Sequence, residues 1–305
     1  MYLKVKVPAT TANLGPGFDV LGAALSLYNE FEVEYVPNAQ KTNFILKGEG
    51  KKTLPKNNKN LVWQSMCETF KILNETRYNL KNLNITINAS IPLNRGLGSS
   101  AATIVGGIIL ANALSKNKLN TSQIANLAIK IEGHPDNVIP AIYGGVCICC
   151  KDKYKDHETV VQLPIPKLKV VLCVPTFEVK TKQSRQILPK YVNLGDAIFN
   201  ISRVTLLTAA FYRADYSLLS HAMQDKIHQP YRGKMIPVMN EVLNAAIVAG
   251  AYGAYLSGSG PTLAALCDKK NIKKVSKAMT KRWEKENIST RTYIADFNRN
   301  GVLKI

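Results

Sequence analysis

One glycine-rich stretch decides the fold of this chain, and it reads Pro92-Leu93-Asn94-Arg95-Gly96-Leu97-Gly98-Ser99-Ser100-Ala101-Ala102. It follows Leu83–Ala89, where the strict alternation of apolar and polar residues predicts a half-buried strand. It leads into the apolar run Ala101–Leu114, which predicts a buried helix. Glycines let the backbone turn tightly and approach a ligand, and the first N–H groups of a helix point outward with the positive end of its dipole. This order of elements predicts a phosphate-binding loop.

Two common phosphate-binding motifs fit this stretch poorly. A Walker A loop needs a lysine before its serine or threonine, and none is present. A dinucleotide-binding fingerprint matches Gly96, Gly98 and Ala101 but also needs an acidic residue about 20 positions later. After Ala102 the first acidic residue is Glu132. An ordinary capped core helix is disfavoured because paired glycines destabilise a helix start that has no ligand.

The bulk composition is that of a globular protein with one large or two medium domains. The chain has 305 residues, and 46% of them are hydrophobic. Residues 1–7 alternate apolar and basic side chains, which is typical of a strand rather than a signal peptide. The longest apolar run, Ala101–Leu114, is shorter than the ~20 residues that span a bilayer. We therefore expect a soluble protein that has no membrane partner.

The cysteines and the charge exclude two further classes of protein. Three of the six cysteines lie in the apolar run Val146–Cys150 and the others have apolar neighbours, which favours buried, reduced thiols in a cytoplasmic protein. The formal charge is +19, and much of the excess lies in the loop Lys47–Lys59 and in Lys269–Lys285. The second segment has one apolar helical stripe with lysines around it, which is typical of a solvated helix face. No stretch in which aromatic residues alternate with basic ones, and no known nucleic-acid-binding module, accompanies these lysines, so we expect attraction of anionic substrates and no nucleic-acid partner.

The remaining pattern predicts an α+β protein in two lobes. Polar residues at Lys151–Thr159 indicate the linker between the lobes. The expected strands are Leu3–Val7, Asn29–Val36, Leu83–Ala89, Ala141–Cys150, Lys169–Pro175, Ala254–Leu256 and Thr262–Cys267. The expected helices, besides the one after the glycine stretch, are Asn60–Leu73, Thr121–Ile131, Asp196–Tyr212 and Met235–Ala249.

Three segments together resemble the GHMP kinases. Residues 92–101 resemble the second motif of that family, P-x-x-x-G-L-G-S-S-A. Residues 8–19, P-A-T-T-A-N-L-G-P-G-F-D, resemble its first motif, and residues 254–262, A-Y-L-S-G-S-G-P-T, resemble its third. The resemblance implies a two-lobed fold. Residues 1–155 would form an ATP-binding lobe like the second domain of ribosomal protein S5, and residues 156–305 an α/β, ferredoxin-like lobe.

Within that family, four segments are similar to the homoserine kinases. They are residues 8–19, E-G-H-P-D-N-V at 132–138, T-K-Q-S-R at 181–185 and Q-P-Y-R-G-K at 229–234. The similarity implies that ATP phosphorylates L-homoserine to O-phospho-L-homoserine, a step toward threonine. Another GHMP kinase such as mevalonate kinase, a decarboxylase of the mevalonate route, or a non-catalytic ATP-binding sensor would share the three motifs and remain alternatives.

Under this resemblance the chain carries a set of residues suited to a zwitterion. Asp19 would pair with the ammonium group of homoserine, and Asn13 would bind its hydroxyl or ammonium region. Arginine forks bind carboxylates well, and two arginines are available for this. The expected substrate-binding residues are Asn13, Asp19, His134, Thr181, Arg185, Arg232, Gly258 and Gly260.

Each of these residues also has a structural explanation. Asp19 and Asn13 suit turns in a glycine-rich loop, and His134 before a proline suits a hydrogen-bonded core histidine. Most arginines lie on the surface, which would account for Arg185 and Arg232. The joint match of four spaced segments favours the substrate roles.

The resemblance also assigns ATP, Mg²⁺ and the catalytic residues. The ion would be bound by Ser100 and Glu132. Other alignments with the family would place Asn126 or Lys130 at the position of its helix-borne glutamate, but Glu132 is the acidic residue in this part of the sequence. Ser100, Glu132 and Asn137 are the expected catalytic residues. The expected ATP-binding residues are Asn60, as the adenine contact, and Pro92, Leu93, Asn94, Arg95, Gly96, Leu97, Gly98, Ser99, Ser100, Ala101 and Ala102.

Two further expectations follow from the resemblance. The first motif has Thr10 and Thr11 and lacks a recognisable lysine–aspartate pair of the kind that acts as a base in mevalonate kinase. The γ-phosphate itself would then accept the proton, with Asn137 positioning nearby groups. A homodimer is common in the family and is expected here.

Overall fold

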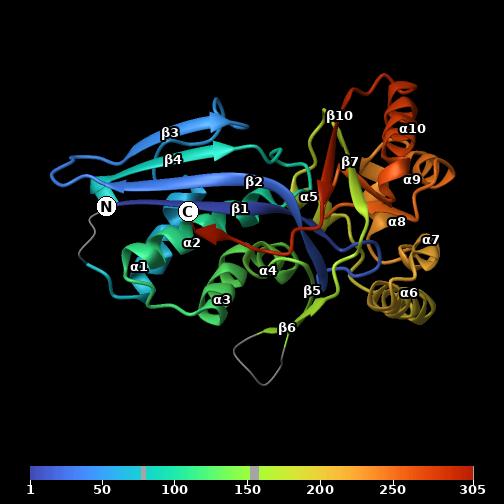
Figure 1. Ribbon diagram of the computed structural model, residues 1–305, viewed down its shortest axis with the longest axis horizontal. Coiled ribbons are helices and arrows are strands. Elements are labelled where there is room, and N and C mark those ends of the chain that lie inside the picture. The colour runs from blue at the N-terminus through green and yellow to red at the C-terminus, as the bar shows by residue number, and fades with distance from the viewer. Residues whose placement is uncertain (77–79, 152–157, 305) are drawn as a thin grey trace.

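The computed structural model describes residues 1–76, 80–151 and 158–304, and in this part of the chain two sheets lie side by side (Figure 1). The predicted linker Lys151–Thr159 falls largely on residues 152–157, outside the described residues. Each sheet has helices packed on one face. The α+β, two-lobed architecture predicted from the sequence is confirmed.

The first sheet contains most of the N-terminal half. Its strands are β1 (Tyr2–Ala12), β2 (Leu21–Tyr35), β3 (Asn43–Gly48), β4 (Leu83–Ala89), β5 (Val146–Lys151), β6 (Glu158–Leu163) and β11 (Leu303–Lys304). The main order is β11-β1-β2-β4-β3, and β5 and β6 extend from β2. The long strand β2 changes partner, because its residues 30–35 pair with β4 and its residues 21–23 pair with β5. It therefore reaches from the middle of the sheet toward the second lobe.

A layer of helices lies below the first sheet in Figure 1. They are α1 (Leu61–Ile72), α2 (Ser99–Leu114), α3 (Thr121–Glu132) and α4 (Pro135–Tyr143). Helix α2 is at the centre, because it packs on β1 and β2 as well as on the other three helices. Nearly all of its side chains are buried, as its uniformly apolar sequence requires.

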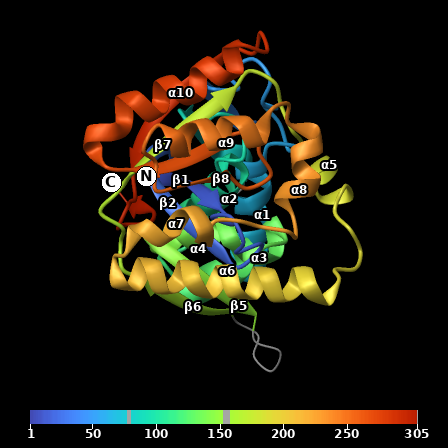
Figure 2. The same ribbon diagram turned by 90° about the vertical axis from the view of Figure 1, so that its right-hand side faces the viewer.

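The second sheet has the order β10-β7-β9-β8. Its strands are β7 (Lys169–Pro175), β8 (Gly253–Leu256), β9 (Leu263–Cys267) and β10 (Thr290–Asp296), and the helices of this half are α5 (Thr181–Gln186), α6 (Leu194–Arg213), α7 (Leu219–Ala222), α8 (Gln229–Arg232), α9 (Met239–Val248) and α10 (Ile272–Glu284). Helices α9 and α10 cover its outer face (Figure 2). Helix α10 packs through Val275, Met279 and Trp283, so its lysines face solvent as the sequence predicted.

The structure differs from the sequence-based expectation at the end of helix α4. The predicted strand Ala141–Cys150 is wrong in its first part, because Ala141–Tyr143 ends helix α4 and the strand begins at Val146. Pro135 at the first turn favours that helix, and a short apolar run fits helix and strand equally well. The lobe boundary predicted at residues 155 and 156 lies outside the described residues and stays a prediction; the strands on either side of it, β5 and β6, pair in the first sheet. In the described part of the chain, no helix is long and apolar enough to span a membrane.

Candidate active site

Three glycine-bearing segments that are far apart in the sequence meet where the two lobes join. The first-motif residue Thr10 donates its backbone N–H to the carbonyl of Leu97 at 3.1 Å. The third-motif residue Ser257 donates its hydroxyl to the carbonyl of Gly96 at 2.6 Å. Gly258 donates its N–H to the carbonyl of Ala12 at 3.2 Å. Each loop is therefore held in place by another loop of the site.

The predicted phosphate loop needs its glycines for two reasons. Gly96 and Gly98 have φ values of 71° and 67°, in the left-handed region that favours glycine. A Cβ on Gly98 would lie 1.8 Å from the hydroxyl oxygen of Thr10, and one on Gly96 would lie 2.2 Å from the carbonyl oxygen of Ser257. The backbone thus approaches its neighbours too closely for a side chain. Gly98 is also the N-cap of α2, so no side chain shields the first N–H groups of that helix.

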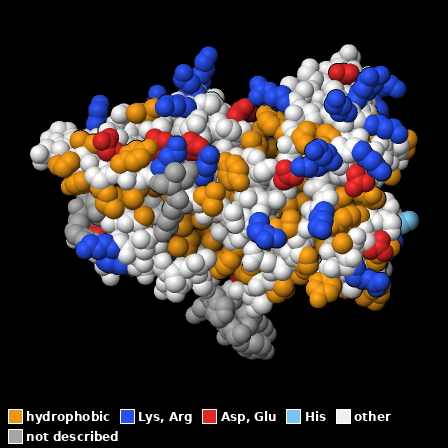
Figure 3. Space-filling model, viewed as in Figure 1, with side chains coloured by type: hydrophobic (Ala, Val, Ile, Leu, Met, Phe, Trp, Pro, Cys, Tyr) orange, Lys and Arg blue, Asp and Glu red, His pale blue; other side chains and the backbone are white. Residues whose placement is uncertain are grey.

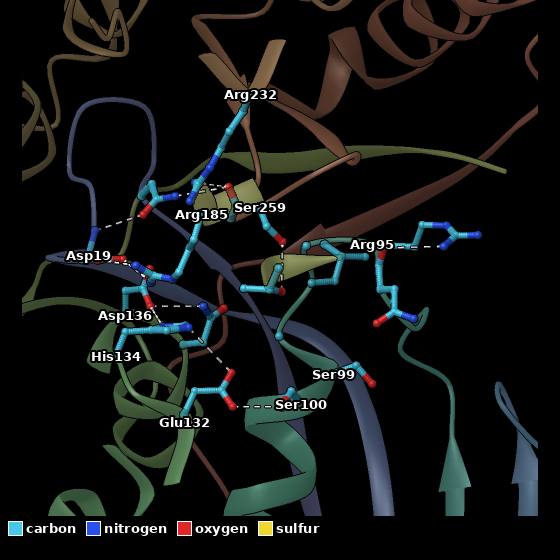
Figure 4. A pocket seen from close by; sticks show the side chains of 18 residues that line it. Asp19, Arg95, Ser99, Ser100, Glu132, His134, Asp136, Arg185, Arg232 and Ser259 are labelled. Carbon is cyan, nitrogen blue, oxygen red and sulfur yellow. Dashed lines mark hydrogen bonds and ion pairs between the residues drawn. The ribbon is translucent and has the colours of Figure 1, made fainter. Parts of the chain in front are cut away.

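Ser100 and Glu132 lie together at the start of α2 (Figure 4). The Ser100 hydroxyl donates to Glu132 Oε2 at 2.9 Å, although the two residues are 32 positions apart. Glu132 is the last residue of α3, and Gly133 ends that helix with a φ of 93°. Burial raises the pKa of Glu132, while the charge of His134 and the Ser100 hydrogen bond oppose this shift. Hydroxyl and carboxylate oxygens side by side are ligands that suit Mg²⁺.

A polar pocket opens beside this helix start, and it is lined by both lobes. The predicted substrate residues Asn13, Asp19, His134, Thr181, Arg185, Arg232 and Gly258 all contribute to its wall, as do Asn94, Arg95, Gly96, Leu97, Gly98, Ser99, Ser100, Glu132, Asp136, Asn137 and Ser259. Gly260 is the predicted substrate residue that is not in this wall. Its φ is 79° and its N–H donates to the carbonyl of Ser257, so it stabilises the turn of the third loop without lining the pocket.

Asp19 and Arg185 form an ion pair in the pocket with two hydrogen bonds. Arg185 Nη1 and Nη2 donate to the two carboxylate oxygens of Asp19 at 2.9 and 2.8 Å. The first loop presents Asp19 in a left-handed conformation, and Asn13 accepts the Asp19 backbone N–H at 3.1 Å. The structure thus brings together two residues that the sequence analysis assigned to opposite ends of homoserine. Both terminal nitrogens of the Arg185 guanidinium already donate to Asp19.

Arg232 is a buried cation in the wall of the same pocket, with 3% of its surface exposed. Its Nη1 donates to the carbonyl of Gly258 at 2.9 Å and its Nε donates to the carbonyl of Ser184 at 3.4 Å. Burial and the nearby charge of Arg185 lower the pKa of Arg232 to about 10. Among the described residues, no carboxylate forms an ion pair with Arg232 and no acceptor takes a hydrogen bond from its Nη2. An anion in the pocket would compensate this charge.

His134 belongs to a hydrogen-bonded chain that ends at the first motif. Its Nδ1 is 2.5 Å from Asp136 Oδ1, which also accepts from the Asn137 amide at 3.2 Å. Asn137 Oδ1 accepts from the Thr10 hydroxyl at 2.7 Å. Burial alone would lower the pKa of His134, but the hydrogen bond and charge of Asp136, together with Glu132, raise it overall. A raised pKa favours the charged ring, in which both nitrogens donate.

The structure places the other predicted ATP residues around α2. Asn60 caps helix α1, because its side chain accepts from the N–H of Val62 and donates to the carbonyl of Pro55. It lines a second, more apolar pocket with Leu93, Asn94, Ser99 and Ser100, beside the phosphate loop. Pro92 lies in the loop, and Ala101 and Ala102 are buried in α2.

Arg95 differs from the other predicted ATP residues, because its guanidinium points away from the pocket (Figure 4). It donates to the carbonyls of Pro175 and Thr176 at 3.1 and 2.7 Å and pairs with Glu178 at 3.2 Å. Its side chain therefore ties the phosphate loop to the second lobe.

Asp136 and Ser259 line the pocket but were not predicted from the sequence as site residues. Both lie inside motif-like segments, next to residues that were predicted, and this proximity was the available signal. Ser259 is 3.4 Å from the Thr181 hydroxyl. Asp19, His134 and Asp136 could together hold a metal ion. However, both Asp19 oxygens already accept hydrogen bonds from Arg185, so this carboxylate is poorly suited to coordinate a metal ion, whereas its remaining lone pairs can still accept from an ammonium group.

Comparison with known families and proteins gives consistent matches. The GHMP kinases N terminal domain model matches residues 60–145, and the GHMP kinases C terminal model matches residues 207–285. A homoserine kinase of Carboxydothermus hydrogenoformans is 45% identical over 262 residues, which is 86% of this chain and 84% of that protein. One of Desulfitobacterium hafniense is 38% identical over 99% of this chain and 100% of that protein.

Solved structures show the same relationship. The crystal structure of a homoserine kinase from Cytophaga hutchinsonii has a TM-score of 0.88 and 33% identity, covering 100% of this chain and 97% of that one. A mevalonate kinase structure has a TM-score of 0.73 at 17% identity, covering 98% of this chain and all of that one, which is a likeness of fold alone.

Proposed function

Because this chain belongs to the homoserine kinases of the GHMP kinase family, we propose that it phosphorylates L-homoserine with ATP. The homoserine hydroxyl oxygen forms a bond to the γ-phosphorus while the bond from that phosphorus to ADP breaks, and the products are O-phospho-L-homoserine and ADP. The enzyme is thus a phosphotransferase that acts on an alcohol group.

The observation that carries this proposal is the charge arrangement beside the start of α2. The pocket holds a carboxylate, Asp19, that can receive an ammonium group, and a buried arginine, Arg232, whose charge has no carboxylate partner among the described residues. A neutral substrate would leave that arginine uncompensated. A zwitterion satisfies both ends of the pocket, and the Asp19–Arg185 pair can share its hydrogen bonds with the ammonium and carboxylate groups.

The phosphate groups of ATP fit the backbone between Gly96 and Ala101. The N–H groups at the start of α2 and its dipole favour an anion there. We assign Mg²⁺ to Ser100 and Glu132, whose oxygens are already in contact. When bound, the ion would neutralise charge on the phosphates. The adenine fits the more apolar pocket next to Asn60.

The proton of the homoserine hydroxyl goes to an oxygen of the transferred phosphoryl group. The described wall of the pocket contains no lysine. The Asn137 amide oxygen accepts from Thr10 and its nitrogen donates to Asp136, so this residue positions the loops; a neutral amide does not act as a base. Phosphoryl transfer depends mainly on positioning and on charge neutralisation, which this wall provides.

The proposal is tested by turnover with a panel of acceptors. Purified protein with ATP and Mg²⁺ should form ADP rapidly with L-homoserine and slowly with mevalonate or galactose. Comparable rates with mevalonate would make the chain a different small-molecule kinase. ATP binding without turnover of any acceptor would support a non-catalytic sensor.

We also propose a homodimer in the cytoplasm, formed through helix α6. Leu194, Ile198 and Ile201 follow helical spacing on its outer face and are 75%, 58% and 63% exposed. Such an apolar stripe is typical of a protein interface. The mass measured by light scattering during gel filtration should be twice that of one chain, and Ile198→Glu should halve it. Ile45→Glu, at an exposed position of β3, is the matched control. A monomeric wild type contradicts this part of the proposal.

A further inference from the structure

His228 lies directly before helix α8, is 0% exposed, and uses both of its ring nitrogens. Its Nε2 is 2.7 Å from the carbonyl oxygen of Gly15, in the first glycine loop. Its Nδ1 is 3.3 Å from Nη1 of Arg232, one helical turn further along the chain. The imidazole therefore connects the first loop to the buried arginine of the pocket.

The two partners permit one protonation state of His228. A carbonyl oxygen can only accept, so Nε2 must carry the hydrogen and donate it to Gly15. A guanidinium can only donate, so Nδ1 must offer its lone pair to Arg232. A second proton, on Nδ1, would place an N–H of His228 opposite an N–H of Arg232, and the hydrogen bond between these two side chains would be lost. The geometry thus requires a neutral imidazole with its hydrogen on Nε2.

The charges around His228 are consistent with this state. Asp225 lies 3.7 Å from Nε2, which would favour a charged ring. The Asp225 carboxylate, however, already accepts the backbone N–H groups of His228 and Gln229 at 2.8 and 2.6 Å. Arg232 faces the ring from α8, and Asp19 contributes a weaker field from the first loop. Burial lowers the pKa of His228. The charge of Asp225 raises this pKa, and the charge of Arg232 lowers it.

Phe18 extends the same arrangement into the pocket wall. Its ring stacks on the His228 ring with centroids 5.2 Å apart. The guanidinium carbons of Arg232 and Arg185 lie 5.1 and 5.8 Å from the centre of the Phe18 ring. Such contacts hold a planar cation in one orientation. His228 and Phe18 therefore fix Arg232 from two sides.

We propose that His228 is a positioning residue for substrate recognition: as a neutral acceptor it orients the Arg232 guanidinium, and as a donor it anchors the loop that carries Asn13 and Asp19. With Nη1 held by His228 and the Gly258 carbonyl, Nη2 of Arg232 is left for the carboxylate of the substrate. This inference rests on the proposed homoserine kinase activity.

Two variants separate the two hydrogen bonds. His228→Asn can place an amide oxygen near the position of Nδ1 and keep the acceptor for Arg232. His228→Gln can place an amide nitrogen near the position of Nε2 and keep the donor to Gly15. The measurement is KM for homoserine and for 2-amino-1,4-butanediol, which has an alcohol in place of the carboxylate. The wild-type enzyme should discriminate strongly between these two acceptors.

We expect His228→Gln to raise KM for homoserine about tenfold or more, because it loosens a hydrogen bond to a charged group, and to reduce the discrimination. His228→Asn should keep the discrimination near the wild-type ratio, and KM for ATP should stay constant in both variants. Equal discrimination by all three proteins, or equal losses toward both acceptors and ATP, would overturn the inference.

A measurement on the unmodified protein decides the case even if the variants fail to fold. Nitrogen-15 NMR of labelled wild-type protein should show His228 neutral, with its hydrogen on Nε2, from about pH 6 to 8, where an ordinary histidine titrates. A charged ring, or a hydrogen on Nδ1, contradicts the inference. If wild-type protein fails to phosphorylate homoserine, the proposed function is wrong. If the wild-type enzyme is active and its His228 variants behave like it, only the positioning role of His228 is wrong.

Discussion

At the scale of single residues, Ser100 and Glu132 carry the clearest prediction for catalysis. Their oxygens meet at the start of α2, where charge on the phosphates must be neutralised. Ser100→Ala and Glu132→Gln should each lower turnover about a hundredfold or more, comparable to the loss of another electrostatic stabiliser. ATP binding, measured by calorimetry, should change far less.

The control for this pair is Glu68→Gln, which removes an exposed carboxylate of α1 away from the pocket. It should have wild-type turnover and the wild-type dependence on Mg²⁺ concentration. If Glu132→Gln behaves like this control, the metal-ligand assignment is wrong.

Arg232 supports a second prediction at the same scale, which concerns the substrate carboxylate. A hydrogen bond to a charged group contributes about 1.5–3 kcal/mol, so Arg232→Leu should raise KM for homoserine roughly ten- to a hundredfold. KM for ATP should barely change. Arg232→Lys should recover part of the loss, because a point charge cannot reproduce the planar fork.

The acceptor 2-amino-1,4-butanediol makes this test specific to the carboxylate. The wild-type enzyme should use it poorly, and Arg232→Leu should reduce its disadvantage relative to homoserine. Arg299→Leu, at an exposed position, serves as the control. Equal damage toward both acceptors would make Arg232 a structural residue.

At the scale of elements, the turn between β4 and α2 depends on Gly98. An alanine there would have a left-handed conformation and a Cβ in contact with Thr10, whose hydroxyl binds Asn137. The conformational strain alone costs roughly 1–2 kcal/mol. Gly98→Ala should therefore lower the free energy of unfolding by at least that much and abolish most activity, measured by denaturant titration and ADP formation.

Gly145 offers a matched control for the same substitution. Its φ is 73°, and the nearest atom to an added Cβ is the Gln162 side-chain nitrogen at 3.5 Å. Gly145→Ala should have the strain of a left-handed alanine without a steric clash of its Cβ, and the variant should keep most of its activity. If both variants lose activity equally, the close approach to Thr10 is unimportant.

At the scale of the whole molecule, the net charge of +19 does not require a nucleic-acid partner. Figure 3 shows Lys and Arg side chains dispersed among acidic and apolar ones on the face in view, with no continuous basic band. Retention on heparin or DNA should therefore disappear between low and moderate salt, as non-specific phosphate contacts do. A sequence-selective complex at physiological salt would contradict this expectation.

The local elements of the site were determined by the sequence alone. The alternation in Leu83–Ala89, the glycines after it and the apolar run that follows are short-range signals, and the structure has β4, the loop and α2 at those positions. The motifs also predicted the family, which the comparisons confirm. These patterns can be identified without knowledge of the tertiary structure, because side-chain periodicity and helix starts depend on neighbours within a few residues.

The tertiary structure decided which charges meet. Arg185 and Asp19 are 166 positions apart, and nothing in either segment indicates that they pair with each other before a substrate arrives. The burial of Arg232 against His228, and the outward turn of Arg95 toward the second lobe, likewise depend on how the lobes pack. Hydrogen bonds and burial act over a few ångströms in space, and sequence separation carries no information about that distance until the chain has folded.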